Sequence, residues 1–209
     1  MQQLAYVKKR VLEWREAPEP TLHSPQEAIV RPVVVARCDS DIVPLFHNVT
    51  TPMKLGLAIH YFDSLVRDML GSDPFRGPFP IGHECVAEAV ECGGDVKNVK
   101  RGDTVIVPWA ISCGHCFNCD HDLTSKCTNS GDTLLAAYGF GSAMGPWGGA
   151  VSDRLRVPYA ERTTPGWSVG HINRVLWECG DGRRGVVVMS CPWIHDEATA
   201  AVRRDLELI

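Results

Sequence analysis

The chain has 209 residues, of which 44% are hydrophobic, and a formal net charge of -4. This length suits one moderate domain, or one domain with an appendage, and the apolar content is sufficient for a core. The acidic balance argues against the basic surface of a nucleic-acid-binding protein, and the sequence has no apolar run of the roughly 20 residues that a membrane span requires. We therefore expect neither nucleic acid nor a membrane among its partners.

The first 110 residues consist of short extended runs separated by turn signals. Valine- and alanine-rich segments at 28–36, 85–92 and 104–109 predict β-strands. The sequences Gly93-Gly94-Asp95 and Arg101-Gly102-Asp103 predict the turns between them. This part of the chain is expected to be a β-rich module.

Two further segments follow different patterns. Between residues 48 and 75, apolar side chains recur at mixed spacings of three and four, which predicts a short helix inserted between strands. Gly148 and Gly149 precede a strand-like run from Ala150 to Val157.

Four closely spaced cysteines give the strongest chemical signal. Cys113, Cys116, Cys119 and Cys127 have the spacing C-x2-C-x2-C-x7-C, which allows four thiolates to surround one zinc ion tetrahedrally. Gly114 is expected to adopt the positive φ angle that a chain wrapping a small ion requires. The pattern predicts a structural zinc site that is closed to substrate.

Disulfide bonds or unpaired buried thiols are the alternative for these cysteines. The chain has nine cysteines, an odd number. Residues 1–14 contain three basic side chains without a following apolar stretch, so no secretion signal is recognised. We expect a reducing, cytoplasmic setting, which favours metal binding over disulfides.

A second constellation lies upstream of this loop. Cys38 follows one predicted strand, and His83 precedes another. A catalytic zinc requires three protein ligands and one open position, and a thiolate with an imidazole supplies two of the three. Taken alone, the pair is also compatible with a buried thiol and a separate hydrogen-bonded histidine.

The order of the surrounding motifs distinguishes these alternatives. The sequence resembles the catalytic, GroES-like domain of zinc-dependent alcohol dehydrogenases, the medium-chain dehydrogenases, over residues 1–160. The matching motifs, in chain order, are Cys38-Asp39-Ser40-Asp41, Gly82-His83-Glu84, Lys100 to Val105, the four-cysteine loop, and Gly148-Gly149 leading to Arg156-Val157-Pro158. The resemblance implies a mainly β fold of the α+β type: a partly open β-barrel with a structural-zinc lobe.

The resemblance also implies roles for individual residues. Cys38 and His83 are expected to bind the catalytic zinc, and Ser40 is expected to relay the alcohol proton. Asp41 is expected to orient His83, and Glu84 to lie behind the metal as an occasional ligand.

The third ligand of the catalytic zinc comes, in that family, from a residue downstream of the structural loop. Asp153 and Glu161 are the candidates by position, and Cys179 is a weaker one. Asp153 stands beside Arg154, so a solvated strand residue is the alternative for it.

The implied reaction is oxidation of an alcohol to an aldehyde or ketone. Zinc would polarise the substrate oxygen and a nicotinamide, NAD or NADP, would accept the hydride. The expected partner is therefore a small alcohol or aldehyde. The sequence does not decide whether the chain forms a homo-oligomer. The alternative function is a non-catalytic, zinc-stabilised structural or interaction module.

Residues 161–209 differ in composition from the rest and are expected to form an irregular C-terminal tail. Gly180 to Gly185 spells G-x-G-x-x-G, but strand-like residues follow where a pyrophosphate-binding loop needs a helix, so a simple glycine-rich turn is favoured. We expect a truncated or frame-shifted segment in place of a nucleotide-binding domain, and hence no alcohol oxidation by this chain alone.

Overall fold

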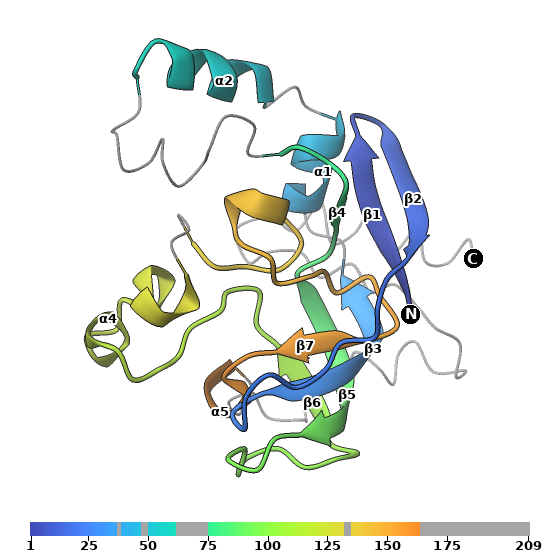
Figure 1. The fold of residues 1–209 in the computed structure, drawn as a ribbon, viewed down its shortest axis with the longest axis vertical. Helices are drawn as coiled ribbons and strands as arrows, with labels where there is room; N and C mark the ends of the chain where they lie inside the picture. The colour runs from blue at the N-terminus through green and yellow to red at the C-terminus, as the bar shows by residue number, and fades with distance from the viewer. Residues whose placement is uncertain (37–38, 47–49, 62–74, 132–134, 164–209) are drawn as a thin grey trace, which may run out of the picture.

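The fold is seen in a computed structural model that describes residues 1–36, 39–46, 50–61, 75–131 and 135–163. The described strands form two antiparallel sheets, and the short helices lie around them (Figure 1). The described strands do not close into a complete barrel. The predicted mainly β, α+β architecture is confirmed.

The smaller sheet has the strand order β2-β1-β4. Strands β1 (Gln2–Lys8) and β2 (Val11–Glu16) form a hairpin, and the two-residue strand β4 (Phe79–Pro80) pairs with the other side of β1. Pro80 has no N–H to donate, which suits a short strand at the edge of a sheet. This sheet places Phe79 and Pro80, a few residues before His83, beside the N-terminal strand β1.

The larger sheet has the order β6-β5-β3-β7. Its strands are β3 (Ala28–Ala36), β5 (Glu84–Cys92), β6 (Thr104–Val107) and β7 (Leu155–Val157). Three of the predicted strands therefore occur where expected. A fourth strand was predicted at 150–157, but only its last three residues form one, the strand β7. The backbone N–H groups of Ala150 and Val151 donate to the carbonyl oxygens of Gly82 and Ile81, which lie outside the larger sheet.

The core lies on one face of the larger sheet. Along β5, Cys85, Ala87 and Ala89 are buried, whereas the residues between them are partly exposed, which is the two-residue period of a half-buried strand. Because Ala87 and Ala89 are small, larger side chains such as Tyr138 and Ile111 pack over them in the same cluster.

Helices are short in the described part of the chain. They are α1 (Asp39–Phe46), α2 (Thr50–Ala58), α4 (Phe117–Asp120) and α5 (Ala160–Thr163), with single 3-10 turns η1 (Thr124–Lys126), η2 (Thr128–Ser130) and η3 (Gly141–Ala143). None of the described helices is long and apolar enough to cross a membrane.

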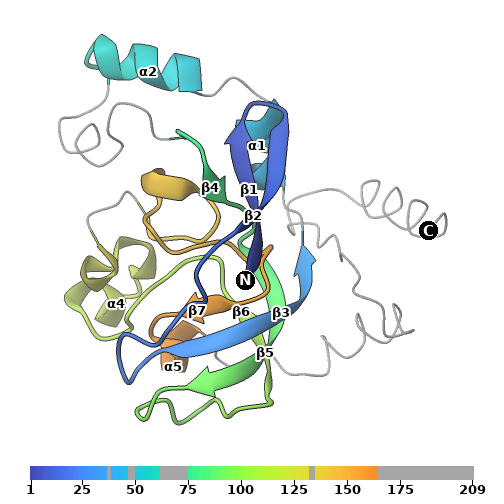
Figure 2. The same cartoon turned by 45° about the vertical axis from the view of Figure 1, so that its right-hand side comes forward.

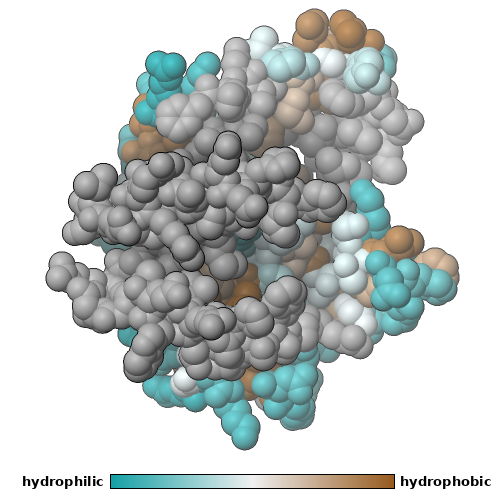
Figure 3. Space-filling view, turned by 180° about the vertical axis from the view of Figure 1, so that it is seen from behind, coloured by the Kyte–Doolittle hydropathy of each residue, from teal (hydrophilic) through white to brown (hydrophobic). Residues whose placement is uncertain are grey.

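Helix α2 lies in the segment for which a helix was predicted, at one end of the molecule and apart from the larger sheet (Figure 2). Viewed from behind, hydrophobic side chains gather on the surface at that end (Figure 3). Leu55 on α2 and Ile59 just beyond it are both largely exposed. The preceding helix α1 was not predicted, because it contains Pro44 and two β-branched residues that disfavour a helix.

Helix α5 spans the domain boundary that the sequence suggested at residue 160. The predictions about residues 164–209, including the glycine-rich turn and Cys179, lie outside the described residues. Cys38, two residues after the last residue of β3 in the sequence, also lies outside the described residues.

Candidate functional site

The four predicted zinc ligands come together in one lobe. Cys113 begins the loop, Cys116 precedes α4, Cys119 lies within α4, and Cys127 separates η1 from η2. Their sulfur atoms all lie within 4.8 Å of one another, and all four residues are buried. Gly114 has the predicted positive φ angle, 75°.

The spacing of the sulfur atoms fits a tetrahedral ion. The Cys116 sulfur lies 3.4 Å from that of Cys119 and 3.9 Å from that of Cys127. Four Zn–S bonds of about 2.3 Å give a sulfur–sulfur separation of about 3.8 Å, close to these distances. The donor set and its size therefore match a structural zinc ion.

Backbone amides are directed at these sulfur atoms. The N–H of Cys113 donates to Cys127 Sγ at 3.2 Å, and the N–H of His115 donates to Cys113 Sγ at 3.5 Å. The backbone N–H of Cys119 lowers the pKa of the Cys116 thiol to about 5, whereas burial raises the pKa of Cys119 to about 12. The amides therefore stabilise a thiolate at Cys116, whereas burial disfavours one at Cys119, and a divalent cation would hold all four groups as thiolates.

A second group of polar side chains surrounds His83. The imidazole Nδ1 lies 3.1 Å from Asp41 Oδ1, and Nε2 lies 3.2 Å from Ser40 Oγ. His83 and Asp41 are both buried. Because an ionised carboxylate can only accept, Nδ1 carries the proton, and the lone pair of Nε2 is available to a metal ion or to the Ser40 hydroxyl.

Two glycines allow the chain to pack closely behind this histidine. Gly82 has a φ angle of 91°, and a Cβ atom there would lie 2.7 Å from the Val151 side chain. At Gly139 a Cβ atom would lie 2.7 Å from the Gly82 carbonyl oxygen. Residues 82, 139 and 151 are therefore packed closely together. This packing fixes the position of His83, the residue just before strand β5.

Glu84 and Phe140 complete the surroundings of His83. Among the described residues, Glu84 Oε2 is a buried oxygen with no hydrogen-bond partner. Burial raises the pKa of this carboxyl group, and the neighbouring His83 partly opposes that shift. The ring of Phe140 packs on the imidazole with a centroid separation of 4.8 Å. An imidazole nitrogen and a carboxylate oxygen without a described hydrogen-bond partner thus occur on neighbouring residues, and both are ligand types that zinc accepts.

The two candidates for the third ligand have partners of their own. Asp153 Oδ2 accepts the backbone N–H of Gln2 at 2.7 Å. Glu161 Oε1 accepts the backbone N–H groups of Lys97 and Asn98. No described contact joins either carboxylate to His83, and within the described part of the chain the four cysteines are the one cluster of three or more metal-binding side chains.

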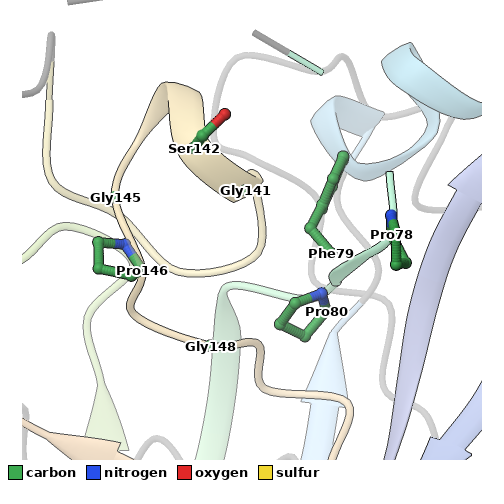
Figure 4. A pocket seen from close by; sticks show the side chains of 8 residues that line it. All are labelled: Pro78, Phe79, Pro80, Gly141, Ser142, Gly145, Pro146 and Gly148. Carbon is green, nitrogen blue, oxygen red and sulfur yellow. The ribbon is translucent and has the colours of Figure 1, made fainter. Parts of the chain in front are cut away.

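A cavity of about 510 Å³ lies between residues 78–80 and the loop that runs from Gly141 to Gly148. Figure 4 shows Pro78, Phe79 and Pro80 on one side and Ser142 and Pro146, with their neighbouring glycines, on the other. Phe140, whose ring packs on His83, directly precedes the lining residue Gly141 in the chain.

Phe140 was not predicted from the sequence. It is a single aromatic residue in a loop and is brought to His83 by tertiary packing, so periodicity gives no signal for it. The glycines around it, at 139, 141 and 145, all with positive φ angles, mark an unusually tight loop and were the available hint.

Comparison with known proteins agrees with the observed fold. The family of the alcohol dehydrogenase GroES-like domain matches residues 24–165. An alcohol dehydrogenase from Thermus sp. ATN1 has a similar fold, with a TM-score of 0.58 at 24% identity over 79% of this chain and 39% of that one.

Curated relatives cover the same region. A zinc-type alcohol dehydrogenase-like protein of Bacillus subtilis, AdhB, is 28% identical over 71% of this chain and 34% of its own length. Zinc-type alcohol dehydrogenase B of Aspergillus flavus is 32% identical over 68% of this chain and 29% of its own. A glutathione-independent formaldehyde dehydrogenase of B. subtilis is 43% identical over 39% of this chain and 20% of its own.

The chain thus spans about a third or less of the length of these curated relatives. The matched region includes the four-cysteine lobe and the residues around His83. This chain belongs to the zinc-type alcohol dehydrogenases, and the part described is their GroES-like domain.

Proposed function

We propose that this chain supplies the catalytic domain of a zinc-dependent oxidoreductase that converts an alcohol to an aldehyde or ketone with NAD or NADP. The observation that carries the proposal is the line of contacts from Ser40 through His83 to Asp41. Asp41 fixes the orientation of the imidazole through Nδ1, and the Ser40 hydroxyl lies next to Nε2, the nitrogen that would bind the metal in place of this hydroxyl.

In this proposal Cys38 and His83 hold the catalytic zinc, and Asp41 fixes the protonation of the imidazole. When bound, zinc supplies a Lewis acid and an open position for the substrate oxygen. Ser40 would relay the hydroxyl proton of the alcohol, accepting it while its own hydroxyl proton passes on toward solvent. NAD or NADP, when bound, would supply the acceptor for the hydride from the alcohol carbon. The lobe formed by the four cysteines holds a second, structural zinc.

The surroundings of His83 support the chemistry in two further ways. The Phe140 ring shields one face of the imidazole from water. The cavity lined by Pro78 and Phe79 offers room for the carbon chain of an alcohol. Formaldehyde belongs among the test compounds, because one relative is named a formaldehyde dehydrogenase and another a formaldehyde dismutase.

The test uses binding as well as turnover, since the chain covers only part of its relatives' length. Cobalt(II) is substituted for zinc, and alcohols and aldehydes are added while the visible spectrum is recorded. We expect the spectrum to respond in the wild-type chain and not in His83→Ala, because only the site at His83 has an open position. A spectrum that is insensitive to every compound, or equally sensitive in His83→Ala, would contradict the catalytic proposal and favour a non-catalytic module.

Turnover is measured in parallel by NADH or NADPH formation on the zinc-loaded chain. From the sequence of residues 161–209 we expect none at a useful rate. Zinc-dependent turnover that disappears in His83→Ala would support the oxidoreductase and contradict the expectation about those residues.

A further inference from the structure

Asn129 lies in η2, two residues after the last cysteine of the lobe. Its side-chain nitrogen Nδ2 is 3.4 Å from Cys113 Sγ and 3.4 Å from His115 Nε2. One amide group therefore touches the first cysteine of the loop and a histidine beside it.

The protonation of His115 fixes the direction of these hydrogen bonds. Its other ring nitrogen, Nδ1, lies 2.9 Å from the carbonyl oxygen of Cys113. A carbonyl oxygen only accepts, so Nδ1 carries the proton and Nε2 is an acceptor. The two hydrogens of the Asn129 amide are then directed one to His115 and one to the Cys113 sulfur.

Tyr159 contacts both Asn129 and His115. Its hydroxyl donates to the backbone carbonyl of Asn129 at 2.9 Å, and its ring lies edge-on to His115 with a centroid separation of 6.3 Å. Tyr159 also packs against the cysteine cluster and directly precedes α5. It therefore connects Asn129 to the part of the chain that follows strand β7.

We propose that Asn129 is a positioning residue for the metal of the four-cysteine lobe. Four thiolates around one Zn²⁺ leave a net charge of about -2, and hydrogen bonds to sulfur reduce the repulsion between them. Cys113 Sγ receives two such bonds, from the His115 backbone and from Asn129. The Asn129 side-chain amide thus strengthens metal binding, while the backbone carbonyl of the same residue connects the lobe to Tyr159.

This inference rests on metal binding by the lobe, which is part of the proposed function. Asn129→Leu keeps a similar volume but removes both donors. We expect its lobe to bind zinc about 10- to 100-fold more weakly in competition with a chromophoric chelator, the usual cost of losing an outer hydrogen bond to a metal ligand. In the cobalt(II) form, we expect the thiolate-to-metal charge-transfer bands to shift to longer wavelength, because an unbonded thiolate is the better electron donor.

Asn118→Leu is the matched control. Asn118 lies in the same lobe, and its Nδ2 donates to the Lys126 carbonyl at 2.5 Å, whereas none of its described contacts is with a cysteine sulfur. A purely structural role for Asn129 would weaken zinc binding similarly in both variants and leave the charge-transfer bands unmoved in both. Tyr159→Phe is expected to weaken binding by less, about two- to tenfold, as for the loss of one ordinary hydrogen bond.

The outcomes separate this inference from the metal site itself. A wild-type chain whose cysteines bind no metal would overturn the proposed lobe site. A wild-type chain that binds zinc, with unchanged affinity and unchanged bands in Asn129→Leu, would overturn the role of Asn129 alone.

Discussion

The four-cysteine lobe and the surroundings of His83 are built in different ways. The lobe takes all its ligands from residues 113–127, and its buried cluster consists of the four cysteines themselves. The His83 group combines residues that are more than 40 positions apart in the chain, and it depends on contacts among α1, the residues just before β5 and the loop at Gly139. One site is made by local spacing and the other by tertiary packing.

This difference suits the two sites to the different roles proposed for them. A short loop with four ligands can enclose an ion on all sides, and such a closed site stabilises structure. A site assembled from separate segments can leave one direction open, and Phe140, which packs on His83, directly precedes a residue that lines a cavity. The two sites should therefore fail in different ways when they are damaged.

The largest expected effect is loss of the lobe in Cys119→Ser. Structural zinc in small peptides contributes on the order of 10 kcal/mol, and the lobe has little apolar packing of its own to replace it. We expect one zinc fewer per chain by metal analysis, together with rapid proteolysis between residues 113 and 131. Cys92→Ser, a cysteine in β5 outside the cluster, is the control and should keep the metal; a Cys119→Ser chain with full zinc content would disprove the assignment.

Gly139→Ala tests the packing behind His83. The new Cβ would lie 2.7 Å from the Gly82 carbonyl oxygen, and the φ angle of 80° is unfavourable for alanine. We expect a loss of about 2 to 5 kcal/mol in urea unfolding. Gly102→Ala separates the two causes, since Gly102 has a φ angle of 92° but nothing within 4 Å. Equal losses in both variants would mean that the contact with Gly82 does not matter.

A smaller effect is expected at Asp41. In Asp41→Ala the imidazole loses the acceptor of its Nδ1 proton, and we expect the metal affinity at His83 to fall about 10- to 100-fold. Asp41→Asn keeps one acceptor oxygen and should lose less. Zinc bound by the lobe is the internal control in both variants, and an unchanged affinity at His83 would remove Asp41 from the proposed site.

The same contrast shows how far the sequence alone could lead. The strand at 28–36, the turn at Gly114 and the cysteine lobe follow from local patterns, and the structure agrees with all three. Helix α1 was not predicted, because Pro44 and its β-branched neighbours disfavour a helix locally.

The contacts around the two sites required the structure. Motif resemblance suggested that Asp41 orients His83, but the 3.1 Å contact depends on how α1 packs against the start of β5. Phe140 and Asn129 carry no local signal, because each becomes informative only through a neighbour distant in the chain. Asp153 and Glu161 were proposed as the third zinc ligand from their positions along the chain. Their hydrogen bonds to backbone N–H groups could not be predicted from those positions.

The number of zinc ions bound per chain tests the central claim most directly. Wild-type protein and His83→Ala are purified with zinc, dialysed against metal-free buffer and analysed by atomic emission, with His121→Ala, an exposed histidine of the lobe, as control. The account predicts two zinc ions for the wild type and for His121→Ala, and one for His83→Ala. A wild-type chain with a single zinc ion, and the same content in His83→Ala, would contradict it.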